Sequence, residues 1–327
     1  MKQLLHTCET GHYAWRRLVR RCCLAIALAV PLAAAERVDN VLAQMVPDNS
    51  VTLVGMRMEQ LKSTPLFQKL IAQEKLPQLD DFARESGFDP RRDVRDLLLA
   101  NNGKQTVLLA RGRFHLNLPA TVKKVNYHGY VIVSNGQDAG FCLLDGTLAA
   151  AGPLPVLQAA LDQYKSGNRN NASALISRAR TIAENYQVWG VTAGTGNFLS
   201  DNMPPAAGGM DFGRLFRSLQ NTLFEADLRN GLKSIAEGNC ASAQDAKALA
   251  DATRGMVGMG RLNTPENQSD LLRLWDGIKV EQADKKVTLT TDIGQDLIDQ
   301  LLKLMQSGGP NHRGPGGQPR PGGSGKP

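Results

Sequence analysis

Histidine is the side chain best suited to acid–base catalysis near neutral pH, and residues 36–306 contain two, His115 and His128. A histidine-dependent hydrolase needs one of them beside a nucleophile and an orienting acid. Both lie among Asn, Lys and Arg residues in a segment typical of a loop or an edge hairpin, which favours solvated surface imidazoles. The chain has no Gly-x-Ser-x-Gly nucleophile elbow and no zinc-binding pattern of Cys and His. We therefore expect no catalytic residue and no metal ligand.

The glycine pair in Gly194-Thr195-Gly196 has the superficial form of a loop that cradles phosphate groups. A dinucleotide fingerprint needs a third glycine and then a helix, and residues 197–205 cannot continue as a regular helix. Residues 193–211 are instead rich in Gly, Pro, Asn and Ala, which predicts a long loop. We expect no cofactor here. Because loops often carry recognition, this loop is the expected contact surface for a partner.

Four carboxylates precede or follow the Asp89-Pro90 dipeptide and could bind a metal or exchange protons. Arginines are interleaved with them at helical spacing, which indicates a solvated helix face with ion pairs. The residues concerned are Asp80, Asp81, Asp93 and Asp96, with Arg84, Arg91, Arg92 and Arg95.

Of the five cysteines, three lie within residues 1–35, which leaves Cys142 and Cys240. Outside the cytoplasm two cysteines can pair. Cys142, however, lies in an apolar strand pattern that is typical of a buried free thiol. The sequence leaves both possibilities open.

The elements that position these residues mix helices and strands. In the first half, the patterns predict helices over 37–46, 61–73, 79–86, from 89 through 97–99, and over 153–164. They predict strands over 51–58, 105–114, 130–134, 141–144 and 147–151. Asn135-Gly136 and Asp145-Gly146 supply the positive φ angles of tight hairpins. Asp89 and Pro90 have the cap and first-turn chemistry of a helix start.

The second half of the chain also shows a mixture of helix and strand patterns. We expect helices over 174–183, from Ser242 to about Leu262, from Thr264-Pro265 through Trp275, and over 297–305. The strands are expected over 187–192, 222–228, 232–237, 279–281 and 287–291. Glycines 255, 258 and 260 would let the long helix approach a neighbour closely.

Both halves end with a hairpin followed by a helix. We therefore predict an α+β fold of two similar lobes, each an antiparallel sheet with helices packed on one face. The predicted domains are a signal peptide at 1–35, a first lobe at 36–165 and a second lobe at 166–306. Residues 307–327 are mainly Gly and Pro, which predicts a disordered tail.

The N-terminus has the order of features that a secretion signal needs. Arg16, Arg17, Arg20 and Arg21 precede an apolar run from Cys22 to Ala35, which ends in three alanines before Glu36. The run is shorter than the roughly 20 residues that span a bilayer. We therefore predict export to the periplasm or beyond and no stable membrane span after cleavage, although a retained anchor and a later start codon stay open.

The net charge of +7 comes from the two ends of the chain. Residues 36–306 carry thirty basic and thirty acidic side chains. A neutral body lacks the electrostatic footprint of a nucleic-acid binder, so we expect no nucleic-acid partner.

Two segments carry a resemblance to a known class of proteins. They are Val46-Pro47-Asp48 and the run from Gly87 to Val94, GFDPRRDV. They resemble the "V-P-D … G-x-D-P-x-x-D" opening of exported or membrane-anchored bacterial proteins of a domain-of-unknown-function type. The resemblance implies an α+β body in the cell envelope and carries no activity and no site residues.

From these features we predict an uncharacterised, non-catalytic binding or scaffold component of the bacterial cell envelope, whose partner is an envelope protein or ligand. Two alternatives stay open. One is an extracytoplasmic hydrolase with carboxylate chemistry, and the other is a helper for envelope assembly or folding.

Overall fold

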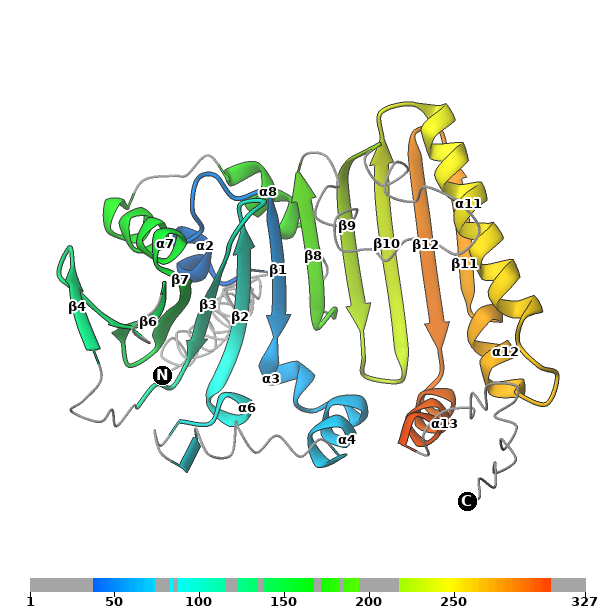
Figure 1. Cartoon of the computed structure of the whole chain (residues 1–327), viewed down its shortest axis with the longest axis horizontal. Coiled ribbons are helices and arrows are strands. Elements are labelled where there is room, and N and C mark those ends of the chain that lie inside the picture. Colours follow the sequence, from blue (N-terminus) through cyan, green and yellow to red (C-terminus); the bar gives the residue numbers. More distant parts are fainter. Residues whose placement is uncertain are drawn as a thin grey trace, which may run out of the picture. The chain divides into compact units, whose positions relative to one another are not determined.

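The strands of the described chain pair into one antiparallel sheet, in the order β11-β12-β10-β9-β8-β1-β2-β3-β7-β6-β5-β4 (Figure 1). The computed structural model describes residues 38–73, 83–84, 88–115, 123–134, 138–167, 172–182, 185–193 and 218–306. The α+β class predicted from the sequence is confirmed. Strands from residues 36–165 and from residues 166–306 join in this sheet through the pairing of β1 with β8.

The strands follow the predicted runs closely. The first seven are β1 (Thr52–Arg57), β2 (Val94–Asn101), β3 (Thr106–Gly112), β4 (Lys123–Tyr127), β5 (Tyr130–Ser134), β6 (Ala139–Asp145) and β7 (Leu148–Pro153). The other five are β8 (Val188–Ala193), β9 (Leu219–Asp227), β10 (Leu232–Cys240), β11 (Ile278–Ala283) and β12 (Lys286–Ile293). The sequence reasoning did not anticipate β4, whose side chains are mostly exposed and therefore show no apolar alternation.

Most of the helices are short. They are α2 (Asn40–Gln44), α3 (Met58–Leu61), α4 (Pro65–Gln73), α6 (Pro90–Asp93), α7 (Leu154–Ser166), α8 (Ser173–Ala179), α11 (Ala243–Leu262), α12 (Ser269–Asp276) and α13 (Gln295–Gln306). Side-chain caps begin α2, α6 and α11. Asp39 accepts backbone N–H bonds from α2, Asp89 from α6 and Ser242 from α11, as Asp and Ser do at helix starts.

Three predicted helices were wrong in extent. The helix expected from Asp89 through Leu99 ends at Asp93, and Leu97–Leu99 belong to β2. The strand forms because β2 pairs with β1 along one edge and with β3 along the other, so that its backbone groups find hydrogen-bond partners on both sides. The helix expected over 61–73 is divided into α3 and α4 before Pro65, and α12 begins at Ser269 rather than at Thr264.

Side chains alternate across the two faces of the sheet, and we name the faces by what packs on them. The α7 face carries the largest core cluster, where side chains such as Leu53, Leu98, Leu109 and Trp189 meet α2, α7 and α8. On the opposite face, which we call the cavity face, α3 and α6 border one end, and α11 covers β10 to β12 at the other end.

Of the three glycines in α11, only Gly260 permits a close approach. A Cβ built there would lie 2.5 Å from the ring of Trp275 on α12, whereas Gly255 and Gly258 face open space. Trp275 also donates its indole N–H to Thr264 Oγ1 at 3.0 Å. The expected close packing is therefore confirmed at one glycine.

Candidate functional site

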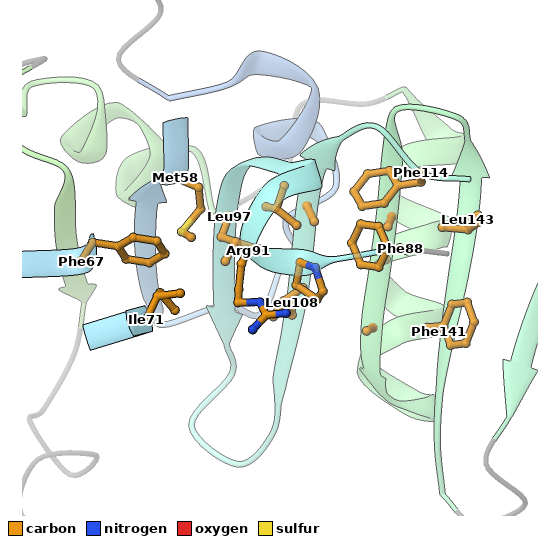
Figure 2. A pocket seen from close by; sticks show the side chains of 16 residues that line it. Met58, Phe67, Ile71, Phe88, Arg91, Leu97, Leu108, Phe114, Phe141 and Leu143 are labelled. Atoms are coloured by element: carbon orange, nitrogen blue, oxygen red, sulfur yellow. The ribbon is translucent and has the colours of Figure 1, made fainter. Parts of the chain in front are cut away.

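A cavity of about 440 Å³ lies between the cavity face of the sheet and helices α3, α4 and α6 (Figure 2). Its sixteen lining residues are Met58, Phe67, Ile71, Phe88, Pro90, Arg91, Val94, Leu97, Leu108, Ala110, Phe114, Phe141, Leu143, Ala149, Ala150 and Ala151. The volume falls within the roughly 300–1,000 Å³ of small-molecule pockets. This cavity is the candidate site.

The floor of the cavity is made by strand register. Leu143, Ala149, Ala110 and Leu97 are directly opposed on β6, β7, β3 and β2. The small side chains at Ala110, Ala149 and Ala151 do not fill the space that leucines would fill at the same positions. The alanine run in β7 is therefore the local sequence reason that a hollow exists.

The walls are aromatic and aliphatic. On α4, Phe67 and Ile71 are four residues apart and point to the same side, as Figure 2 shows. Across the cavity, Phe88 and Phe114 pack with ring centroids 5.3 Å apart and planes tilted by 46°. On the far side of α4, Lys69 forms an ion pair with Asp299 of α13. The ion pair thus joins α4 to α13.

One polar side-chain group, the Arg91 guanidinium, belongs to a lining residue, and it is already paired. Its Nε and Nη2 donate to the two carboxylate oxygens of Asp89 at 2.9 and 3.0 Å. These bonds from Arg91 lower the pKa of Asp89. The pair neutralises both charges at the cavity, so the arginine is not a ready receptor for a second anion.

The lining residues offer apolar surface to a ligand. General acid–base catalysis requires a titratable group within hydrogen-bond reach of the reacting atoms, and the sixteen residues include no His, Cys, Asp, Glu or Ser. What remains is desolvation of apolar surface, which is favourable in proportion to the area removed from water.

The two histidines are not brought together. His115 follows β3 and is exposed. His128 lies in the β4–β5 turn with a positive φ of 47°, where its Nδ1 is 2.8 Å from Asp162 Oδ1 of α7. Tyr127 donates to the other oxygen of Asp162 at 2.7 Å. These exposed contacts tie a hairpin to a helix, and no nucleophile is recorded among them.

Asp93 and Asp96 form ion pairs, as the interleaved arginines indicated. Arg92 Nε is 2.7 Å from Asp93 Oδ1, and Arg95 Nε is 2.8 Å from Asp96 Oδ2. The pairs join sequence neighbours, and Asp96 lies on β2, so the predicted helical spacing of these charges is wrong. Asp80, Asp81, the glycines at 194 and 196 and the rest of the loop to 211 lie outside the described residues, as do residues 1–35 and 307–327.

A second pair of neighbouring carboxylates, Glu225 and Glu237, is relevant to the alternative of a hydrolase with carboxylate chemistry. Burial and the neighbouring Glu237 raise the pKa of Glu225 on β9, against the opposing effect of Arg57. Glu237 in turn accepts from Lys286 at 2.9 Å. Both glutamates are half-buried on the α7 face, away from the cavity. Within the described ranges, no group of three or more His, Cys, Asp or Glu residues is arranged to hold a metal ion.

Cys142 and Cys240 are free and buried. They belong to different core clusters, and burial raises the pKa of the Cys142 thiol to about 11. The buried free thiol is therefore the alternative that the structure supports at Cys142.

Sequence reasoning did not predict the cavity, although it named Pro90 as a helix start and Arg91 as part of an ion-paired face. The lining residues come from seven elements and from the two residues Phe88 and Phe114 outside them, spread over residues 58–151. Apart from Arg91, each is an apolar residue of a type common in protein cores. The one local signal was the run of alanines from 149 to 151, which is unusually small for a buried strand.

No protein-family model matches this chain, and no curated protein matches it. Among solved structures, crystal form III of TP0453 is similar at 8% identity with a TM-score of 0.49, over 80% of this chain and 96% of that chain. Crystal form I of TP0453 is similar at 9% identity with a TM-score of 0.45, over 80% and 95%. Likenesses of this degree carry no argument about this protein. None of the helices in the described ranges combines the length and apolar character needed to cross a membrane.

Proposed function

We propose that this chain is a non-catalytic binding protein of the bacterial cell envelope, exported to the periplasm or beyond, that holds a hydrocarbon chain of its ligand in the cavity. One observation carries the proposal. Fifteen of the sixteen lining residues have apolar side chains, and the sixteenth, Arg91, is paired with Asp89.

A lining of this kind selects the chain of a ligand rather than its head group. Burying a polar group without a hydrogen-bond partner costs free energy, and the cavity offers no unpaired donor or acceptor among its lining side chains. Each methylene moved from water into the cavity gains about 0.8 kcal/mol. A head group would therefore stay in water while the chain enters.

The test is a chain-length series. The full chain is titrated with N-alkyl maltosides of eight to fourteen carbons, each below its critical micelle concentration, in competition with a fluorescent fatty acid. We expect the Kd to fall about fourfold per added methylene until the cavity is full. At one chain length, alkyl maltoside, carboxylate and trimethylammonium should bind within a few-fold of one another. Binding that ignores chain length but follows head-group charge would refute the proposal.

A pair of matched substitutions localises the binding. Ala149→Leu adds a larger side chain to the middle of the cavity floor, and we expect it to weaken alkyl binding. Ala248→Leu makes the same chemical change at an exposed position of α11, and alkyl binding should stay at the wild-type level. Equal affinities of the two variants would place the binding elsewhere.

The alternatives give different results. A hydrolase with carboxylate chemistry would turn over an ester or glycoside substrate and lose that activity on Glu225→Gln. A helper for envelope assembly would bind unfolded polypeptide in competition with the alkyl probe. The two-lobe division between residues 165 and 166 remains part of the proposal, and all sixteen lining residues fall within its first lobe.

A further inference from the structure

The apolar residues that form the cavity floor belong to a row that continues across the sheet beyond the cavity. Phe141, Ala151 and Leu108 line it, and strand register continues their row across the sheet. The row runs Phe141, Ala151, Leu108, Leu99, Val54, Gly190, Phe224, Ala236 and Leu289, each residue directly opposed to the next on the neighbouring strand. Every member is apolar.

Beyond the cavity this row reaches solvent. Phe224 is 39% exposed, and Leu99, Val54, Gly190 and Ala236 are half-buried. Figure 1 shows the strands that carry them in the middle of the sheet, with α11 over the β11–β12 end. The centre of a sheet face is an unusual place for an exposed phenylalanine side chain unless that face binds something.

Two features shape the surface around this row, namely a glycine within it and a row of polar residues beside it. Gly190 forms a low point between Val54 and Phe224, because it has no side chain. The next row on the same face is polar, and it runs Asn101, Thr52, Thr192 and Thr222. There Thr192 Oγ1 and Thr222 Oγ1 are 2.9 Å apart and share a hydrogen bond. The apolar row, which we call the track, therefore has a line of hydroxyl groups along one side. Along its other side lies a second apolar row, which consists of Leu97, Met56, Val188 and Ala226.

The length of the track fits one acyl chain. From Leu99 on β2 to Phe224 on β9 there are three strand spacings of about 4.8 Å, or about 14 Å. An acyl chain of a membrane lipid occupies half of a hydrocarbon core about 30 Å thick, or about 15 Å. The track is continuous with the cavity floor.

We infer that the ligand is a lipid with two acyl chains, one in the cavity and the other along the row from Leu99 to Phe224. This inference rests on the proposed function of the cavity and adds the number of chains. The second chain gains affinity without a second diffusional event, because the head group already links the two chains.

The experiment compares lipids that differ only in chain number. Dioctanoyl-phosphatidylcholine and monooctanoyl-lysophosphatidylcholine, each below its critical micelle concentration, are titrated against the full chain in competition with the fluorescent fatty acid. We expect the two-chain lipid to bind at least about tenfold more tightly, since about two further buried methylenes suffice for that gain.

Two substitutions test the track itself. Gly190→Leu blocks the low point, and its backbone accepts a side chain because a Cβ there would meet its nearest atoms at 3.6 and 3.7 Å. Phe224→Asp places a charge on the track. Both should reduce binding of the two-chain lipid to the level of the one-chain lipid and leave one-chain binding unchanged. Gly255→Leu, in open space on α11, is the matched control and should alter neither.

The outcomes separate this inference from the proposed function. Equal affinity of wild-type protein for both lipids, or an unchanged two-chain affinity in Gly190→Leu, overturns the second chain site and leaves the cavity in place. Failure of wild-type protein to bind the one-chain lipid overturns the cavity and the track together. Lipid-free dimers that Phe224→Asp dissociates would assign the row to a second copy of the chain and also overturn the inference.

Discussion

Replacing Gly55 with alanine should destabilise the protein at the contact between β1 and β8. Gly55 is directly opposed to Trp189, and the indole lies over the glycine. A Cβ at Gly55 would be 2.1 Å from two ring carbons of Trp189, which is itself only 3% exposed. Carbon atoms pack at about 3.5–4.0 Å, so the ring would have to move within a core cluster that leaves it little room.

The loss of stability in Gly55→Ala can be estimated by comparison with Gly190→Ala, because Gly190 is a glycine of the same sheet and follows Trp189 on β8. Changing either glycine to alanine reduces the freedom of the unfolded chain, a stabilising effect of about 0.4–1 kcal/mol that cancels in the comparison. Only Gly55→Ala adds the overpacking cost of about 1–3 kcal/mol. We therefore expect the free energies of unfolding of the two variants to differ by about 1–3 kcal/mol, with Gly55→Ala the less stable.

Urea unfolding followed by circular dichroism measures this difference, and a double-mutant cycle identifies its cause. In a Trp189→Leu background the steric conflict is relieved, so Gly55→Ala should lose most of its cost there. If Gly55→Ala is as stable as Gly190→Ala, or if its cost persists without the indole, the steric reasoning is refuted.

Three further predictions concern titratable groups. The pKa of Glu225 is raised by burial and by Glu237, so the stability linked to its protonated form is lost as pH rises through that pKa. Glu225→Gln should therefore raise the urea midpoint of unfolding at pH 7 and lose this advantage in acid. An unchanged midpoint at pH 7 would contradict this prediction. Bonds from Arg91 lower the pKa of Asp89, so their stabilising effect is present at pH 7 and fades below about pH 4. Asp89→Asn, which keeps a helix cap, should cost about 1 kcal/mol at pH 7 and become harmless in acid, unlike a purely structural loss. Burial raises the pKa of Cys142 to about 11, so iodoacetamide should alkylate it only as fast as the protein unfolds, and rapid labelling of native protein would show an accessible thiol.

Local sequence signals predicted the elements where one rule was dominant. Ser242 with Asp245 predicted the start of α11 and Asp89 predicted that of α6, and Ser242 and Asp89 cap these helices. The same rules failed at Leu97–Leu99, because a short apolar run is equally compatible with a helix and with a strand buried on both faces. Pairing with β1 and β3 decided between them, and pairing is a long-range property.

The candidate site was beyond the reach of local rules for the same reason. Chemistry-bearing residues can be sought by type, so the histidines and carboxylates could be considered one by one from the sequence. An apolar cavity has no such marker. Its residues are ordinary core side chains, and the hollow exists because Ala110 and Ala149 meet in register beneath Phe67 and Ile71, which come from a distant helix.

By itself, the sequence determined the α+β class, most strand positions, the neutral charge of residues 36–306 and the absence of known catalytic motifs, because these depend on composition and on patterns only a few residues long. The tertiary structure decided that the strands form one sheet, that Cys142 and Cys240 stay apart, and that one apolar row crosses the sheet from the cavity to Phe224. These properties depend on register, and register is set by the packing of whole strands against their neighbours.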